Sequence, residues 1–423
     1  MFKKIILKNN LRLILAPLDS SNAVTVLIMV GTGSRYESRK LNGISHFLEH
    51  MFFKGTKKRP TTFGISAELD KIGAEFNAFT GKETTGFYIK ANAKYLDLSL
   101  DILSDMLLNS IFDTKEINKE RGVILEEMKM IQDTPMHYVS DLFENLLYKG
   151  NPLGQMIIGS EKNILNFKQK DFLNYLRGHY VANNMVICVA GNSEKIKKSK
   201  LKTEKYFQAA NKNFIKEKRS NILRVQSKPN ILLHYKKTDQ VNFCLGVKAY
   251  GLEDKKRFAL KLLAVILGGN MSSRLFVEIR EKKGMAYYVR TIHEAYVDTG
   301  YLVTQVGVDR KNLQKSVKII LKEYKKIVNK GVSNKELQKA KDYIKGISSI
   351  NLETSDQIAN FLTNQEILLG KTSTPKQHFE KIDKVSVRDI QNVAKDIFMN
   401  KKLNLAIIGE YKDKKEFEEI LKF

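Results

Sequence analysis

The 423-residue sequence lacks any apolar run of the roughly 18 residues that a membrane-spanning helix needs, so it predicts no stable membrane insertion. Two early lysines are reminiscent of a signal peptide, but Lys8 and Arg12 interrupt the apolar residues and no cleavage site follows. We therefore interpret the N-terminus as the first strands of the mature fold. This interpretation favours a cytoplasmic protein, or one in an organelle matrix after removal of a presequence.

Cysteine is almost absent. Cys188 and Cys244 each lie in an apolar, strand-like run, and neither has the spacing of a cysteine metal site. Two isolated cysteines of this kind are typical of buried thiols in a reducing compartment.

Acidic residues are few compared with basic ones. The 46 Asp and Glu residues face 72 Lys and Arg residues, which gives a net charge of +26. Such a charge favours nucleic acids or anionic membranes as partners when it is concentrated in one patch. Here the basic residues are spread over the whole chain without a nucleic-acid-binding motif. The default interpretation is a lysine-rich solvated surface, and we predict no nucleic-acid partner.

The second half of the chain repeats the first. Residues 114–124 resemble residues 333–344, and residues 179–191 resemble residues 396–409. The offsets, 220 for the paired Glu116 and Glu336 and 218 for the glycines that end the second pair, nearly agree. A length of 423 residues also exceeds one ordinary hydrophobic core. These observations predict a tandem duplication of one domain.

The pattern of apolar residues predicts an α+β fold, in which each of two homologous domains has a mostly antiparallel or mixed β-sheet with helices packed on one side. The expected domains are 1–212, with the metal site, and 229–423, joined by a polar, basic linker at 213–228. Strands are expected at 23–30, 75–80, 84–91 and 184–191, and helices at 44–53, 94–110 and 114–132.

The sharpest local signal is the segment His46-Phe47-Leu48-Glu49-His50. On a helix, the two histidines lie about 40° apart, so both imidazoles reach one ion, and Glu49 lies on the same face. This is the inverted H-x-x-E-H arrangement of zinc peptidases. The alternative is a pair of hydrogen-bonded core histidines beside an ionised glutamate.

A catalytic zinc site also requires a third protein ligand. The helix expected at 114–132 carries Glu120, Glu126 and Glu127. Glu120 and Glu127 are about 20° from alignment and share a face, whereas Glu126 points about 100° away from Glu127. Glu127 as ligand, with Glu120 behind it orienting a ligand histidine, is a coherent geometry. Spacing alone does not choose the ligand, because a glutamate on a charged helix usually faces solvent.

Three segments in order, HFLEHMFFKGTKKRP, GAEFNAFTGKETTGFY and ERGVILEEM, strongly resemble the insulinase and pitrilysin superfamily, in particular its processing-peptidase branch. The likeness extends over essentially the whole chain. It implies one Zn²⁺ per chain, held by His46, His50 and Glu127, with Glu49 as the catalytic base and Glu120 orienting a ligand.

The resemblance also implies substrate-binding residues. Asn77, Ala78 and Phe79 match a strand whose free edge pairs with a substrate backbone, although the same residues fit an ordinary hairpin strand. Arg280 and Tyr287 match a pair near the scissile bond. Without the resemblance, they would be interpreted as a surface arginine and a packed aromatic residue.

The function implied is a zinc-dependent endopeptidase that hydrolyses extended peptides or presequence-like segments. In double-length relatives, the zinc and the Arg/Tyr pair sit in the first and last of four homologous domains. A chain with two domains is therefore expected to form a homodimer with shared active sites. The alternative is a non-catalytic scaffold subunit of the same fold, and a nucleic-acid-binding protein is a third, more distant possibility.

Overall fold

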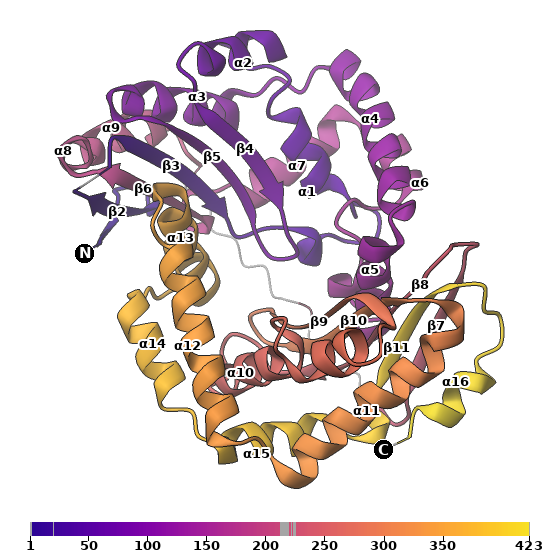
Figure 1. Cartoon of the computed structure of the whole chain (residues 1–423). Helices are drawn as coiled ribbons and strands as arrows, with labels where there is room; N and C mark the ends of the chain where they lie inside the picture. Colours follow the sequence, from indigo (N-terminus) through magenta and orange to yellow (C-terminus); the bar gives the residue numbers. More distant parts are fainter. Residues whose placement is uncertain (1, 20, 212–219, 221, 223–225, 423) are drawn as a thin grey trace. The chain divides into compact units, whose positions relative to one another are not determined.

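The computed structural model describes residues 2–19, 21–211, 220, 222 and 226–422, and these form two compact units (Figure 1). Unit 1 comprises Met1–Met128, Gln155–Ser220 and Ser349–Thr374, and unit 2 comprises Lys129–Gly154, Asn221–Ser348 and Pro375–Phe423. Each unit therefore contains a short stretch from the opposite half of the sequence. The linker expected at 213–228 lies mostly outside the described residues, and the domain division 1–212 and 229–423 stays a prediction.

The sheet of unit 1 is mixed. In the described residues its order is β1 (Lys3–Ile6), β2 (Arg12–Leu18), β6 (Met185–Asn192), β3 (Ala23–Val30), β5 (Thr85–Asn92) and β4 (Glu75–Thr80). Only β2 and β6 run parallel there, and the other neighbours are antiparallel. Strand β4 lies at one edge of this sheet.

The sheet of unit 2 has the same plan. Its order is β7 (Asn230–Tyr235), β11 (Asn404–Gly409), β8 (Val241–Ala249), β10 (Gly300–Val308) and β9 (Ala286–Ala295). Strands β7 and β11 are parallel, like β2 and β6, and the remaining pairs are antiparallel. From β2 onward, strand order and direction thus repeat between the described parts of the units, and β1 is an additional strand of unit 1. The predicted α+β class with two mixed-sheet domains is confirmed.

The helices that begin in unit 1 are α1 (Ile44–Met51), α2 (Thr62–Asp70), α3 (Leu96–Asn109), α4 (Thr114–Gln132), α6 (Glu161–Asn166), α7 (Gln169–His179), α8 (Ser193–Lys197), α9 (Ser199–Phe207) and α13 (Ser355–Leu369). Those that begin in unit 2 are α5 (Pro135–Leu147), α10 (Arg257–Gly268), a π-helix (Phe276–Glu281), α11 (Leu313–Lys330), α12 (Asn334–Asn351), α14 (Pro375–Asp383), α15 (Val387–Ile397) and α16 (Lys415–Ile420). Among the described helices, none has both the length and the apolar character needed to cross a bilayer.

Most expected elements agree with these bounds to within two residues. The helix expected at 44–53 ends at Met51, because the chain turns there toward Gly55, whose φ of 135° lies in the left-handed region.

Cys188 and Cys244 are free and buried, as predicted. Burial raises the pKa of both thiols, so they are uncharged and inert at neutral pH.

The inner strands of the unit 1 sheet are buried on both faces. On one face, Leu27 belongs to an apolar cluster with Leu362 of α13. The next side chain, Ile28, points to the opposite face, where its cross-strand neighbour Phe87 packs against Phe52 just after α1, with ring centroids 5.0 Å apart. The sequence predicted helices on one side of the sheet only. Helix α13, which comes from the second half of the chain, covers the other side.

Helix α13 is also held by polar contacts. Glu366, with 1% of its side chain exposed, forms ion pairs through Oε1 with Lys4 Nζ at 2.8 Å and with Arg12 Nη1 at 3.3 Å. At the start of the helix, the hydroxyls of Ser355 and Thr25 lie 2.8 Å apart in a hydrogen bond. A buried glutamate needs such partners to offset its desolvation. These contacts select one position of α13 on the sheet.

Unit 2 contains the counterpart of α13. Helix α5 packs on strands β7, β8 and β11, and its buried Glu144 accepts hydrogen bonds from the hydroxyls of Tyr296 and Tyr301. The two helices begin at Pro135 and Ser355, which are related by the same 220-residue offset as the sequence repeat. The duplicated halves have therefore exchanged equivalent helices, and each unit needs a segment of both halves to cover its sheet.

We expect Leu362→Ala to lower the free energy of unfolding by about 2–5 kcal/mol, since it removes a buried side chain from the cluster beneath the unit 1 sheet. Urea unfolding of the full chain measures the loss. Gln357→Ala, an exposed change on the same helix, is the matched control and should stay within about 0.5 kcal/mol of wild type. Equal stability of the two variants would contradict the role given to α13.

Candidate metal centre

Helix α1 is fixed in the core by its apolar side. Phe47 and Leu48 are fully buried and Met51 is nearly so. The ring of Phe47 packs edge-on against Phe172 of α7, with centroids 5.0 Å apart. Aromatic contacts of this kind add stability beyond the area that they bury. Because this side faces inward, the other side of the same short helix presents its ionisable residues together.

A buried carboxylate binds the start of α1. Glu37 accepts hydrogen bonds from the backbone N–H groups of Gly43 and Ser45, each at 2.8 Å, and from the amide of Asn42 at 3.0 Å. Burial raises the pKa of Glu37, against the effect of these hydrogen bonds. Gly43 has a φ of 102°, which suits glycine. Sequence reasoning missed Glu37, because no helix period relates a loop residue to the helix that it caps.

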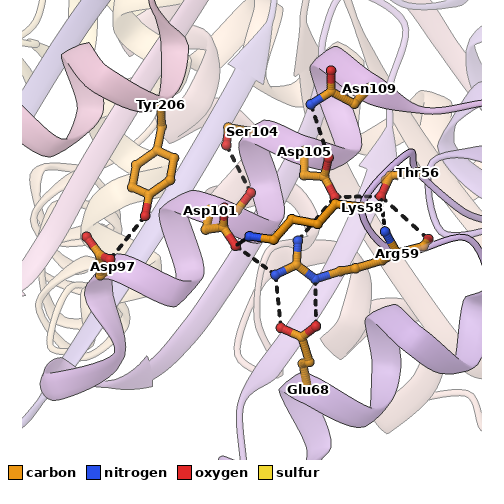
Figure 2. A network of polar contacts seen from close by, with 10 residues as sticks. All are labelled: Thr56, Lys58, Arg59, Glu68, Asp97, Asp101, Ser104, Asp105, Asn109 and Tyr206. Atoms are coloured by element: carbon orange, nitrogen blue, oxygen red, sulfur yellow. Dashed lines mark hydrogen bonds and ion pairs between the residues drawn. The ribbon is translucent and has the colours of Figure 1, made fainter.

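The loop after α1 is held by the polar network of Figure 2. The buried guanidinium of Arg59 forms paired 2.9 Å hydrogen bonds with Glu68 of α2 and further bonds to Asp101, at 2.7 Å, and Asp105, at 3.1 Å, of α3. Thr56 also donates to Asp105, at 2.5 Å. Bidentate pairs between arginine and carboxylate are directional. They hold the C-terminal end of the α1 segment against α3.

Three side chains converge as a possible metal site. His46 Nε2 lies 3.5 Å from Glu127 Oε1, and His50 Nε2 lies 3.5 Å from Glu127 Oε2. One ligand atom from each of the three residues lies within 4.8 Å of the others. Tetrahedral zinc with ligands at about 2.1 Å separates those ligands by about 3.4 Å. The spacing and the donor types, two imidazole nitrogens and a carboxylate oxygen, therefore fit a zinc ion.

The structure also separates the three glutamates of α4. Glu127 is half-buried and faces the histidines, whereas Glu126 lies on the exposed side of the helix. Glu120 is buried, and its Oε1 is 2.8 Å from His50 Nδ1. Glu120 thus contacts the ring nitrogen of His50 that does not face Glu127, as expected for a group that orients a ligand.

Charge is concentrated at this centre. Hydrogen bonds with His46 and His50 lower the pKa of Glu127 well below its usual range. Burial lowers the pKa of His50, but hydrogen bonds to Glu120 and Glu127 outweigh it and raise that pKa to about 9. The two neighbouring carboxylates thus favour a positive charge at this ring, from a proton or from a bound cation.

Glu49 lies on the same face of α1 but outside the three-residue set. Its Oε2 is buried and has no hydrogen-bond partner among the described residues. A carboxylate oxygen that is removed from water without a protein partner is costly. Such an atom suits a group whose partner arrives with the metal or the substrate.

The predicted substrate strand is β4, at the edge of the unit 1 sheet and packed beside α1. The side chain of Asn77 accepts a hydrogen bond from the N–H of Ala78 at 2.9 Å. Phe79 is about one-third exposed, at 36%, and its ring lies over Gly86 of β5, where even a methyl group would clash. Thr80 contacts the carbonyl of Ser45 in α1 at 3.5 Å. The edge strand and the histidine helix are thus joined within one unit.

Arg280 and Tyr287 lie in unit 2 and contact each other. The guanidinium of Arg280 lies 5.3 Å from the ring centre of Tyr287 and 4.9 Å from that of Phe276. Tyr287 is 76% exposed, and Arg280 belongs to the π-helix, a form of helix that often marks functional sites. The structure therefore brings these two predicted residues together as a pair.

Comparison with known proteins shows the family. The family described as Insulinase (Peptidase family M16) matches residues 13–161, and the Peptidase M16 inactive domain matches residues 166–344. The uncharacterized zinc protease YmxG of Bacillus subtilis is 34% identical over 399 residues, covering 94% of this chain and 96% of that protein. An uncharacterized zinc protease of Rickettsia felis is 34% identical over 406 residues, covering 95% and 96%. The chain belongs to the insulinase family of peptidases.

Solved structures agree on the fold. A protease from Helicobacter pylori superimposes with a TM-score of 0.88 at 24% identity, covering 97% of this chain and 99% of that one. A peptidase M16 inactive domain from Pseudomonas fluorescens has a TM-score of 0.89 at 16% identity, with coverage of 97% and 98%. The family model and the sequence relatives confirm the superfamily predicted from the sequence, while membership of the processing-peptidase branch stays a prediction.

Proposed function

We propose that the chain is a zinc-dependent endopeptidase, of the processing-peptidase branch, that hydrolyses extended peptides or presequence-like segments. The observation that carries the proposal is the convergence of His46, His50 and Glu127 beside Glu49. The names of the relatives, which are called zinc proteases, support the choice of metal. The cytoplasmic location inferred from the sequence belongs to the same proposal.

His46, His50 and Glu127 would hold one Zn²⁺ per chain. When bound, such an ion lowers the pKa of a bound water to about 7 and polarises the carbonyl of a peptide bond. Glu49 takes a proton from the attacking water and passes it to the leaving nitrogen as the bond breaks. Glu120 holds the ring of His50 through its Nδ1 atom.

The edge strand β4 would bind the substrate by β-augmentation, through Asn77, Ala78 and Phe79. A peptide that pairs with a sheet edge is held extended by main-chain hydrogen bonds, while its side chains enter pockets. The side-chain oxygen of Asn77 accepts a hydrogen bond from the N–H of Ala78, and a substrate strand that paired through this N–H would displace it. A folded protein offers no free strand for this pairing, and the preferred substrates are therefore short or unfolded.

Arg280 and Tyr287 would complete the site from a second copy of the chain. Both are hydrogen-bond donors suited to a developing oxyanion or to a substrate backbone. The four-domain arrangement implied by the resemblance requires two copies of a two-domain chain, and a two-fold dimer is the commonest closed assembly. We therefore propose a homodimer with shared active sites.

The second half is proposed to act as a partner domain without a metal. The family description that matches residues 166–344 is that of an inactive domain. Helix α10, at the position comparable to α1, contains no histidine or glutamate. All three candidate ligands lie outside the matched range. A scaffold protein has no need of the complete His46, Glu49, His50 and Glu127 set, which favours the enzyme over that alternative.

We expect purified protein to contain about one zinc per chain, and His50→Ala to lose it, because two of three protein ligands hold the ion poorly. Metal analysis after purification without chelators measures this. His137→Ala is the control, since His137 is exposed and lies outside the three-residue set, and it should keep the zinc. Full zinc retention by His50→Ala would refute the ligand assignment.

We expect Glu49→Gln to keep both zinc and fold but to lose hydrolysis by roughly 10²–10⁴-fold, the usual contribution of a positioned acid–base group. The assay is cleavage of an unstructured peptide library, with the cut sites mapped by mass spectrometry. Glu126→Gln changes an exposed glutamate next to a ligand and should cleave like wild type. A zinc-loaded Glu49→Gln chain with wild-type kcat would remove Glu49 from its role.

Complementation tests the shared site. Glu49→Gln chains and Arg280→Ala/Tyr287→Phe chains should each be nearly inactive alone. After subunit exchange, a mixed dimer has one site with both lesions and one intact site, so activity should return toward half of wild type per mixed dimer. If exchange is demonstrated and no activity returns, each chain builds its own site and the shared-site proposal is wrong.

A further inference from the structure

Lys54 contacts the carboxylate that orients His50. Its Nζ lies 2.6 Å from Glu120 Oε2, while Glu120 Oε1 lies 2.8 Å from His50 Nδ1. The two oxygens of one carboxylate thus bind two donors that come from the same short segment, four residues apart. Sequence reasoning did not single out Lys54, because it lies beyond the end of α1, where helical periodicity no longer predicts the direction of a side chain.

The burial of Glu120 makes this contact important. Its side chain is 6% exposed, so it needs donors in place of the water that it has lost. To hold the ring of His50 through its Nδ1 atom, Glu120 must direct one oxygen at that atom. Lys54 provides both the compensating charge and a fixed direction, since it binds one oxygen and leaves the other for His50.

The second histidine has no such support. His46 Nδ1 is buried and has no hydrogen-bond partner among the described residues. Among the protein groups that the structure describes, orientation of a ligand ring by an outer hydrogen bond therefore depends on Glu120. A contact that fixes Glu120 consequently affects half of the imidazole ligands of the site.

We propose that Lys54 is a positioning residue of the metal centre, which acts through Glu120 to hold the ring of His50 in its metal-binding orientation. The inference rests on the proposed function, because it assumes that His50 binds zinc. Among the ion pairs of the described residues, Lys54 binds Glu120, whereas His46 and His50 bind Glu127, so Lys54 is not itself a ligand. Its effect should therefore appear in metal affinity and ligand geometry rather than only in turnover.

The test compares Lys54→Met with Lys57→Met in the full-length chain. Both remove a lysine charge from the same loop, but only Lys54 has an ion pair with Glu120, and Lys57 is exposed. Competition with a chromophoric chelator should show zinc binding weakened roughly 10-fold in Lys54→Met, the low end of the effect of outer-shell changes, and unchanged in Lys57→Met. The visible absorption of the Co²⁺-substituted chain should shift only in Lys54→Met.

A double-mutant cycle separates positioning from a general loss of stability. If Lys54 acts through Glu120, the change Lys54→Met should have no further effect on zinc affinity in a Glu120→Gln chain. Additive losses would overturn the inference, as would equal zinc affinities of wild type and Lys54→Met. If Lys54→Met does not fold, Lys54→Arg replaces it in the comparison. This variant keeps the cation and should retain affinity within about threefold, and a 10-fold loss there would also overturn the inference.

The outcomes for this inference and for the proposed function are distinct. A wild-type chain that binds no zinc contradicts both. A wild-type chain that binds zinc tightly but hydrolyses no peptide contradicts the peptidase proposal alone. The chelator assay still measures the effect of the Lys54 variants on zinc affinity in that case. A chain that binds zinc and cleaves peptides, with affinity independent of Lys54, contradicts only the positioning role.

Discussion

The site depends on one constraint, that helix α1 must bury its apolar side while carrying three ionisable side chains on the other. Phe47 and Leu48 are excluded from solvent, so the helix has no freedom to rotate about its axis without exposing them. The orientation of the helix therefore fixes the direction in which His46, Glu49 and His50 point. A helix of only eight residues is not stable alone, and its position follows from packing rather than from helix propensity.

The cost of placing charge in this setting is offset by partners drawn from distant parts of the chain. Glu37 satisfies the N-terminal N–H groups of α1, and Glu120 of α4 binds both His50 and Lys54 at the other end. The network around Arg59 then holds the following loop to α3. Each end of the helix is thus fixed by a buried carboxyl side chain with several donors, which restricts the positions that the candidate ligand side chains adopt.

The exchange of α5 and α13 gives the duplicated halves a second kind of linkage. Helix α5, from the first half of the chain, covers one face of the unit 2 sheet, and α13, from the second half, covers one face of the unit 1 sheet. The two helices begin 220 residues apart. The apolar period of α13 is that of any amphipathic helix and does not specify which sheet it covers. Specificity comes from polar contacts such as Glu366 with Arg12, which only the unit 1 sheet offers.

Much of the molecule follows from local spacing in the sequence. The i, i+4 separation places His46 and His50 on one face of any helix, and alternation of apolar residues identifies strands such as β3, because both properties belong to the backbone geometry. The repeat at an offset of 220 likewise implies two domains of one kind before any contact is known. The family was recognised from short segments of this type.

Other features were decided by tertiary structure. The position of Glu127, rather than Glu126, beside the two histidines depends on how α4 docks against α1, and a helix period gives only the angle between the two glutamates. The contacts of Glu37 and Lys54 join residues through loops, where no period relates sequence distance to position in space. The sequence by itself determined which candidate residues share a helix face and where most helices and strands lie. Only packing decided which carboxylate meets which imidazole, because such a meeting is a property of two surfaces and not of one segment.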